Sequence, residues 1–373
     1  MTPSSTSSLV IHCSPQQQGH TTTSQIMLLV IAACLPAILI STYFFGIGVV
    51  LNIVFSSACA IFFESVVLKI RGKNLPANLS DNSALVTAVL LGIAIPPGSE
   101  WWLILSGVFF AIVIAKHVFG GLGQNLFNPA MCGYAILLLS FPLEMTSWHI
   151  PVASQGETSF SPLSLTSILT SIQFVFPALA TETLSNSLNL ADGLAMATPL
   201  IEQKMAGRNA IMTALESGVS WIELVDRRSA TGWELINIGF MLGGLFLIYK
   251  KVISWHIPLS IIGSITVLSL LFYSESSVNI NGTTYLHLFG SATMIGAFFI
   301  ATDPVSAATT PIGKLIYGVI IGCCIYSIRV WGSYLDSIAF AVLIGNFCAP
   351  LIDHYCAPTI YGHSEKRLWK QIH

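Results

Sequence analysis

Long apolar runs that contain almost no charged residues are the feature that most constrains this chain. Of its 373 residues, 54% are hydrophobic and only 9% are charged, and the mean hydropathy is +0.76. Soluble domains carry about 25% charged residues, and a helix that spans a membrane needs about 20 mostly apolar ones. The composition therefore predicts an all-α polytopic membrane protein with about ten transmembrane helices and one sizeable loop. The formal net charge of −2 leaves no basic excess for binding nucleic acid.

Charged residues and clusters of proline and glycine divide the sequence into candidate membrane segments. The candidates are residues 26–45, 47–68, 84–96, 101–115, 126–141, 233–249, 252–273, 285–302, 315–328 and 338–352. Segment 84–96 is shorter than a bilayer and stops at Pro96-Pro97. Short apolar segments interrupted by proline or glycine are typical of discontinuous membrane helices.

Basic residues assign the sides of the membrane, because short loops rich in Lys and Arg stay in the cytoplasm. With both termini in the cytoplasm, Arg329 is the basic residue of a short outer loop. The basic residues expected inside are Lys69, Arg71, Lys73, Lys116, Lys250, Lys251, Lys314, Lys366, Arg367 and Lys370. Segment 142–232 holds the remaining four and is long enough to be exempt from the rule, so it is expected outside the cytoplasm.

The predicted segments divide the chain into five parts. These are a cytoplasmic N-terminal tail (1–25), a first five-helix membrane repeat (26–141), an extracytoplasmic loop (142–232), a second five-helix membrane repeat (233–352) and a cytoplasmic C-terminal tail (353–373). An odd number of crossings in each half makes the halves point in opposite directions, as in inverted repeats. The similar sequences SALVT at 83–87 and SATM at 291–294 lie at matching positions, and a proline break follows each. Broken helices at such positions predict a site near the membrane midplane.

Three acidic residues lie in or beside the apolar segments. Glu64 is inside the second, Asp81 precedes the third, and Asp303 ends the eighth. An ionised carboxylate at the centre of a membrane helix costs about 2.5–3.5 kcal/mol, so it usually faces a partner, a cavity or an ion path. A capping role is the alternative, and the Asn82-Ser83 pair that follows Asp81 favours it there.

Two classes of function fit these features of the sequence. Inverted repeats and broken helices suit a small-solute channel or transporter. A chain of this kind can also be a membrane anchor that holds haem or quinone for electron transfer. The histidines His117, His256, His287 and His354 lie at or near segment ends and are expected at the surface or in caps, which argues against paired haem ligands. There is no CxxC pair, so a metal site built by this chain alone is not expected.

One segment of the predicted outer loop carries a first resemblance. The run Asp192-Gly193-Leu194-Ala195-Met196-Ala197-Thr198 reads as a plain accessible turn by composition alone. It also resembles the site at which flavin transferases attach FMN, with Asp-Gly, a short variable stretch and then Ala-Thr. The resemblance implies that Thr198 accepts the flavin phosphate as an ester and that a flavin transferase is a maturation partner.

Two further segments carry a second resemblance. The run KHVFGGLGQNLFNPA at 116–130 and the run IATDPVS at 300–306 resemble the inner loop and the late T-D-P segment of the RnfD and NqrB family. In the first run, Gly120, Gly121 and Gly123 permit unusual dihedral angles, and Asn125 and Asn128 can satisfy backbone groups where a helix begins. Either a tight helix turn or a flavin can use the close backbone approach.

The second resemblance implies a fold and a function. The implied fold is two inverted five-helix repeats, similar to urea transporters. The implied function is electron transfer between ferredoxin or NADH and NAD or other acceptors, coupled to ion translocation across the bacterial inner membrane, with segment 142–232 in the periplasm. The implied partners are RnfA, RnfB, RnfC, RnfE and RnfG, and the relation to NqrB implies a second, noncovalent flavin. The complex, rather than this chain alone, then holds the complete active site.

Overall fold

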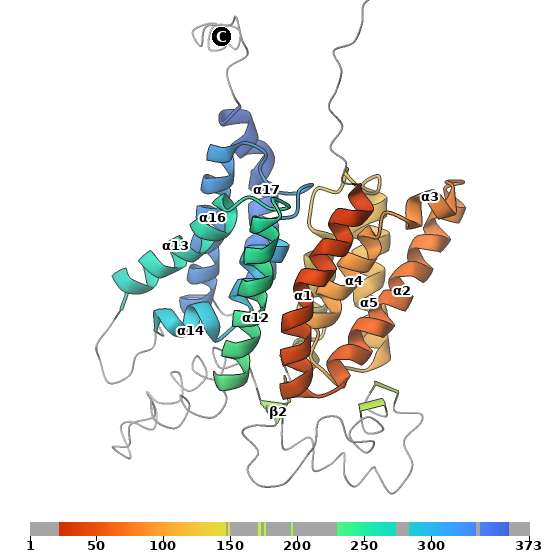
Figure 1. The fold of residues 1–373 in the computed structure, drawn as a ribbon, viewed down its shortest axis with the longest axis horizontal. Helices are drawn as coiled ribbons and strands as arrows, with labels where there is room; N and C mark the ends of the chain where they lie inside the picture. Colours follow the sequence, from red (N-terminus) through yellow and green to blue (C-terminus); the bar gives the residue numbers. More distant parts are fainter. Residues whose placement is uncertain are drawn as a thin grey trace, which may run out of the picture.

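Helices dominate the computed structural model, which describes residues 22–146, 148–149, 171–172, 175–176, 195–196, 230–273, 283–332 and 336–357 (Figure 1). In the first half the elements are α1 (Thr23–Phe45), α2 (Gly48–Ile70), α3 (Leu75–Leu79), α4 (Ser83–Ala94), α5 (Trp101–Phe109), the π-helical η1 (Phe110–Val118) and α6 (Pro129–Ser140). Then follow α7 (Pro142–Thr146) and the two strands β1 (Trp148–His149) and β2 (Ala195–Met196). The second half contains α12 (Ala230–Tyr249), α13 (His256–Leu271), α14 (Thr284–Phe289), α15 (Thr293–Ile295), the π-helical η5 (Gly296–Ile300), α16 (Pro311–Val330) and α17 (Ile338–Tyr355).

Six of the described helices are long and apolar enough to cross a membrane. They are α1, α2, the continuous α5–η1, the 232–249 part of α12, α16 and α17. Three shorter apolar helices, α4, α6 and α13, accompany them. The prediction of a helical polytopic membrane protein is confirmed, with one small addition. β1 and β2 form an antiparallel pair, in which Trp148 lies opposite Met196 and His149 opposite Ala195.

Local sequence signals explain where several helices begin and end. The Thr22 hydroxyl accepts a hydrogen bond from Gln25 N at 3.4 Å, and the Gln25 side chain accepts one from Thr22 N at 3.1 Å, which together form a capping box for α1. Gly46 ends α1 at φ 83°, a conformation that glycine adopts without steric cost. α6 and α16 each start with a proline after an Asn or Thr cap, at Asn128 and Thr310.

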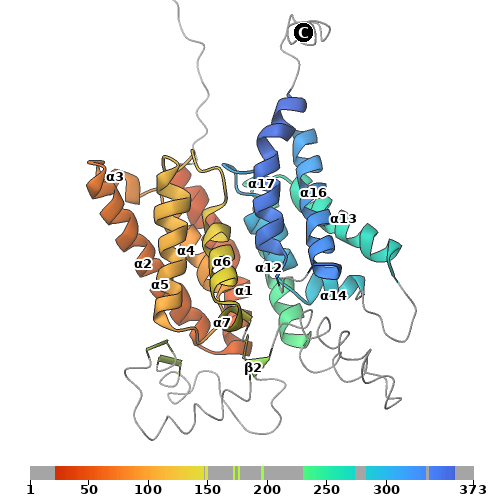
Figure 2. The same cartoon turned by 180° about the vertical axis from the view of Figure 1, so that it is seen from behind.

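The two ends of the helical bundle differ in their residues. One end, called the strand end below, carries β2 and α7 (Figures 1 and 2), together with β1, which pairs with β2. The opposite end, called the basic end, carries α3, the start of α1 and the end of α17 (Figures 1 and 2). Its basic residues outside the helix interiors are Lys69, Arg71, Lys73, Lys250, Lys251 and Lys314. The described basic residues therefore gather at the end opposite the strands, apart from Arg329.

The two halves of the chain meet through helices at equivalent positions. α1, the first helix of its half, packs along α12, the first of the other, and the two run in opposite directions (Figure 1). α6 and α17, the last helices, also contact each other. Within the halves, α2 packs on α4 and α5, while α13 packs on α16 and α16 on α17. Contacts between equivalent elements are typical of two units related by a twofold axis.

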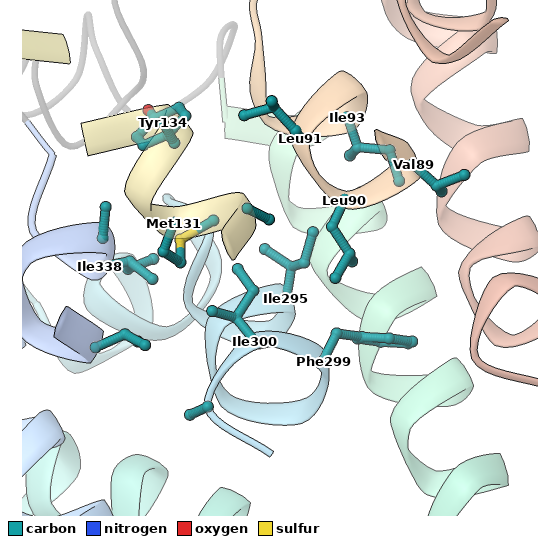
Figure 3. Packing of buried hydrophobic residues seen from close by; sticks show 14 of the residues in the cluster. Val89, Leu90, Leu91, Ile93, Met131, Tyr134, Ile295, Phe299, Ile300 and Ile338 are labelled. Atoms are coloured by element: carbon teal, nitrogen blue, oxygen red, sulfur yellow. The ribbon is translucent and has the colours of Figure 1, made fainter. Parts of the chain in front are cut away.

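The centre of the protein is an apolar core between the broken helices. Figure 3 shows side chains of α4, α6, α15–η5 and α17 pointing toward one another, among them Leu90, Met131, Ile295, Ile300 and Ile338. The apolar segment expected at 285–302 is not one continuous helix. This segment is divided into α14, α15 and η5, because the chain turns between Gly290 and Ala292. Both halves therefore place a short helix at the core.

Replacing Gly243 with alanine is expected to destabilise the contact between α12 and α1. A Cβ at Gly243 would meet the carbonyl group of Ala33, and helix backbone cannot move aside as the end of a flexible side chain can. Overpacking of this kind costs about 1–3 kcal/mol. The measurement is thermal unfolding of the purified protein in detergent, with Gly263→Ala in α13 as the matched control.

At Gly263 an added Cβ would meet nothing within 4 Å. Alanine is also favoured over glycine within a helix by about 0.8–1 kcal/mol. The control variant should therefore unfold at or above the wild-type temperature. Equal unfolding temperatures for Gly243→Ala and Gly263→Ala would contradict the tight approach of α1 and α12.

Candidate functional site

The first candidate site is a cavity at the strand end, between the two halves. Its wall includes the aromatic residues Phe45, Tyr134, Trp148, Trp233 and Phe240. The polar residues of the wall are Ser41, Thr146, Asn237, Ser291 and Asp336. We call this space the aromatic cavity. A mostly apolar space with a few polar groups is the usual form of a site for a small organic ligand.

Strand β1, part of segment 142–232, contributes Trp148 to the wall of the aromatic cavity. The Trp148 ring lies against Trp233, with ring centroids 4.7 Å apart, and against Phe45, with centroids 5.6 Å apart. Opposite Trp148 in the strand pair is Met196 of β2. The predicted modification residue Thr198 lies outside the described residues, and Met196, two residues before it, is paired with Trp148 of the cavity wall. Strand β2 is the described part of the DGLAMAT segment.

Two protic groups from different halves meet at the wall of the aromatic cavity. The Tyr134 hydroxyl of α6 donates a hydrogen bond to Asp336 Oδ2 at 2.7 Å, and Ile338 N of α17 donates to Asp336 Oδ1 at 3.1 Å. The sequence alone does not single out Tyr134 or Asp336. The one available signal was Asp336 itself, an acidic residue between two apolar segments and seven residues after the isolated Arg329.

The second candidate site is a cavity on the basic-end side of the core. We call it the polar cavity, because its wall includes Ser83, Thr87, Lys116, Asn125, Asn128, Thr302 and Asp303. Among the described residues, the two cavities share no wall residue, and residues of the apolar core line both of them. Neighbouring residues of the core face different cavities: Phe299 lines the polar one and Ile300 the aromatic one. Ala130 and Met131 divide in the same way.

A buried ion pair lies beside the polar cavity. Lys116 Nζ is 2.5 Å from Glu64 Oε1 and donates to the Ser83 hydroxyl at 2.7 Å. Lys116 and Glu64 are only 3% and 2% exposed. His117 Nε2 lies 3.5 Å from the same carboxylate oxygen. Glu64 thus faces a partner of opposite charge, which was one of the roles expected for a carboxylate inside an apolar segment.

The second half contains a matching arrangement around Arg329. Arg329 donates to the Thr293 hydroxyl at 3.0 Å, to the His287 carbonyl at 2.6 Å and to the Ser337 hydroxyl at 3.0 Å. Lys116 lies near the C-terminal end of η1 and Arg329 near that of α16. Each bonds a hydroxyl at the start of a short helix of its half, Ser83 of α4 or Thr293 of α15. In the first half the carboxylate contacts the cation directly, whereas the direct partners of Arg329 in the described structure are neutral.

Several placements expected from the sequence are wrong. Lys116 was expected in an inner loop and Arg329 in an outer loop, but both are buried within the last turns of η1 and α16. His117 and His287 were expected at the surface or in caps and are also buried, at 7% and 1% exposure. For the two basic residues the reason is the same. Polar groups of neighbouring helices satisfy the side chains of Lys116 and Arg329, so the helices continue past them.

The other two acidic candidates have local partners. Asp81 Oδ1 accepts hydrogen bonds from Ser83 N at 2.8 Å and from the Ser83 hydroxyl at 2.7 Å, so it satisfies the first backbone N–H of α4, while Asn82 occupies the N-cap position. Asp303 accepts a hydrogen bond from the Ser306 hydroxyl at 2.8 Å and lines the polar cavity. The structure therefore brings Asp303 and Lys116 to the wall of the same cavity, while Asp81 is linked to it through Ser83.

The glycine-rich turn after η1 has the conformation that its sequence predicts. Gly120, Gly121 and Gly123 all have positive φ, at 124°, 108° and 85°. Asn128 accepts a hydrogen bond from Met131 N at 3.3 Å as the cap of α6, and its amide donates to the Ile300 carbonyl of the other half at 3.2 Å. The turn thus has a structural role, and its asparagines also line the polar cavity.

Comparison with known proteins identifies the family. The model of the NQR2, RnfD, RnfE family matches residues 10–362. The chain is 45% identical to the D subunit of the ion-translocating oxidoreductase complex of Vibrio atlanticus (strain LGP32) over 358 residues, which cover 95% of this chain and 99% of the relative. The protein of the same name from Yersinia pestis is 45% identical over 361 residues, covering 95% and 98%. The one from Sodalis glossinidius (strain morsitans) is 44% identical over 355 residues, covering 95% and 99%.

The chain belongs to the NQR2, RnfD, RnfE family. The family resemblance expected from the sequence is therefore confirmed. The two segments that carried it, 116–130 and 300–306, come from different halves of the chain. Both contribute to the wall of the polar cavity, through Lys116, Asn125 and Asn128 on one side and Thr302 and Asp303 on the other.

Replacing Lys116 with methionine is expected to reduce stability strongly, because it leaves the Glu64 carboxylate buried without its cation. Breaking a buried pair in this way costs about 3–5 kcal/mol, whereas replacing both charges is often close to neutral. The double variant Glu64→Gln/Lys116→Met should therefore unfold at a higher temperature than Lys116→Met alone. Thermal unfolding in detergent is the measurement.

Lys69→Met is the matched control, since Lys69 is an exposed residue near the end of α2. Its unfolding temperature should stay close to that of the wild type. A double variant less stable than Lys116→Met would show that the two charges do not act as a pair.

Proposed function

We propose that the chain is a flavin-carrying electron-transfer component of a membrane complex that couples electron transfer to ion translocation. FMN is attached to Thr198 through a phosphoester, and its ring enters the aromatic cavity. The observation that carries this proposal is the pairing of β2 with β1. It brings the backbone of Met196, two residues before Thr198, opposite Trp148 in the cavity wall.

The residues of the aromatic cavity fit an isoalloxazine ring. The ring is flat and mostly apolar with polar edges, and aromatic side chains provide flat apolar walls of the kind it needs. Asn237, Ser291 and Asp336 supply hydrogen-bonding groups in the same wall. When bound, a flavin takes up one or two electrons, while the protein positions it and sets its electrostatic surroundings. In the proposed function Trp148 and Trp233 orient the ring and exclude water from it.

The basic and strand ends correspond to the cytoplasm and the periplasm in this proposal. The described basic residues gather at the basic end, which is the distribution that the positive-inside rule gives for a cytoplasmic face. Segment 142–232 then lies in the periplasm of a bacterial inner-membrane protein. The relatives are named as parts of a complex, which supports assembly with other subunits, and RnfA, RnfB, RnfC, RnfE and RnfG are the proposed partners.

We also propose that the two halves are inverted five-helix repeats with ten membrane-crossing segments, as in urea transporters. Three observations support this. α1 packs on α12 in the opposite direction, α6 contacts α17, and both halves contain a short helix at the core. The equivalent bonds of Lys116 to Ser83 and of Arg329 to Thr293 support the same relation.

The polar cavity is the proposed place of a second, noncovalent flavin. Lys116, Asn125 and Asn128 offer hydrogen-bond donors, and Asp303 offers an acceptor, in a wall that is otherwise largely apolar. The redox partners of the complex, from ferredoxin or NADH to NAD or other acceptors, remain part of the proposal. Among the acidic candidates for an ion path, Asp303 is the one that lines a cavity.

Electron transfer is favoured over the two other functions. A channel or transporter requires a path between the two ends, whereas the two cavities share no wall residue in the described structure and apolar core residues line both. The relatives named for an oxidoreductase complex also support electron transfer. A haem anchor needs two histidines that face each other as paired ligands. His117 and His287 are buried, but they lie in different halves, at the ends of η1 and α14.

Thr198→Val is expected to abolish covalent flavin. The substitution keeps the size of the side chain but removes the hydroxyl that forms the ester. The protein is coexpressed with a flavin transferase, denatured and separated on a gel, and the fluorescence of the band is recorded under ultraviolet light. Mass spectrometry of the peptide that contains residue 198 should find an FMN adduct in the wild type. Thr213→Val, in the same loop, is the control and should stay fluorescent. A fluorescent Thr198→Val band would move the attachment elsewhere.

Reporter fusions test the orientation. A reporter that is active only outside the cytoplasm is expected to be active when fused near residue 200 and inactive when fused near Lys251, which lies at the basic end. The physical reason is that short loops rich in Lys and Arg resist translocation. The reverse pattern would place Thr198 on the cytoplasmic side.

A further inference from the structure

Asp336 is the ionisable carboxylate in the described wall of the aromatic cavity. It lies just before α17, and each of its oxygens accepts one hydrogen bond: Oδ2 from Tyr134 and Oδ1 from Ile338 N. Two donors to the carboxylate stabilise its ionised form. Each oxygen of an ionised carboxylate keeps a further lone pair, so the group can still take up a proton without losing either bond.

The local charge around Asp336 is balanced by Arg329 of α16. Arg329 Nε donates to the hydroxyl of Ser337, the residue next to Asp336, at 3.0 Å. The titratable or charged groups around Asp336 in the described structure are Tyr134 from α6 and Arg329 from α16, with His287 of α14 beyond the guanidinium. One cation and one carboxylate thus form a neutral set at the cavity. In a low-dielectric interior, an additional charge beside such a set is costly.

We propose that Asp336 is the proton-exchanging group of the aromatic cavity, taking up one proton when a redox ligand in that cavity gains an electron. The inference rests on the proposed function, in which the ligand is the flavin. One electron arrives from a redox centre of the complex, and one proton from the strand-end solvent binds Asp336. The cavity thereby regains its original charge. When the electron leaves, the proton leaves the carboxyl group again. Tyr134 orients the carboxylate, and Arg329 holds the adjoining Ser337.

Asp336→Asn removes the charge of the carboxylate and keeps the shape of the side chain. Asparagine has the same size as aspartate and can still accept the hydrogen bonds of Tyr134 or Ile338 N, since Asn also serves at helix starts. Asp336→Glu keeps the charge. Glu100→Gln is the matched control, because Glu100 is an exposed acidic residue at the start of α5 whose carboxylate bonds Trp102 outside the cavity wall.

The experiment is a redox titration of the bound flavin, followed by absorbance, in the purified full chain at several pH values. In the wild type, the midpoint potential should fall as the pH rises. In Asp336→Asn, the potential should be higher at neutral pH, because a negative charge is gone, and its dependence on pH should be weaker. Asp336→Glu and Glu100→Gln should keep the wild-type dependence.

An unchanged pH dependence in Asp336→Asn would overturn the proposal while leaving the flavin assignment intact. A colourless wild-type protein would overturn both, so the two failures are distinguishable. Should Asp336→Asn not fold, Tyr134→Phe tests the same point. Loss of the hydroxyl removes a donor to the ionised carboxylate, so the pH-dependent range should move to higher pH. A Tyr134→Phe profile identical to that of the wild type would contradict the proposal.

Discussion

The structure depends on how a chain satisfies the ends of helices that stop inside a membrane. Hydrocarbon offers no hydrogen-bond partners, so irregular backbone at that depth must find them within the protein. At the end of α4 the amide of Asn52 donates to the carbonyls of Ile95 and Pro96, at 3.3 and 3.0 Å. In the second half, the Asn237 amide donates to the Phe289 carbonyl at 2.8 Å and its oxygen accepts from Met294 N at 3.3 Å. Buried asparagines therefore make the breaks stable.

The two halves solve the same problem with different charges. Lys116 donates a hydrogen bond to the Ser83 hydroxyl at the start of α4, and Glu64 beside it neutralises its charge. All three residues belong to the first half. Arg329 bonds the matching hydroxyl of Thr293, but the carboxylate of its surroundings, Asp336, is bonded by Tyr134 of the other half. The first arrangement pairs its two charges directly, beside the polar cavity. In the second, the carboxylate lies in the wall of the aromatic cavity and does not contact the cation in the described structure, so it is the one that can respond to a change of charge in the aromatic cavity.

The sequence predicted the helices well where apolar length decides them and less well where distant polar groups do. The span expected at 26–45 and α1 (Thr23–Phe45) agree, because capping residues and a glycine limit the helix. The span expected at 101–115 was too short, because the charged Lys116 was expected to lie in a loop. The helix continues to Val118 because Glu64, 52 positions earlier, neutralises that lysine. A single sequence does not reveal such a pair.

The candidate sites divide in the same way. The glycine-rich turn, the Asn128 cap and the T-D-P segment were recognised because their residue types carry local chemistry. The meeting of these segments in one cavity was not predictable, since it depends on the packing of two halves. At the aromatic cavity, the role of Tyr134 was equally hard to predict. The sequence of α6 indicates only an aromatic membrane residue, and its hydroxyl gains a partner when Asp336, 202 positions later, packs against it.

The separation of the two cavities bears on how electrons and ions are coupled in the proposed function. Adjacent residues, such as Phe299 and Ile300, face opposite cavities, so the wall between them is thin and apolar. Electrons cross such a barrier between nearby redox groups without any opening. An ion does not, because leaving water for an apolar barrier costs several kcal/mol or more. Ion passage must therefore use a rearrangement of the broken helices or a path formed with other subunits. The asparagine bonds at those breaks, including Asn128 to Ile300, are the contacts that such a rearrangement would have to exchange.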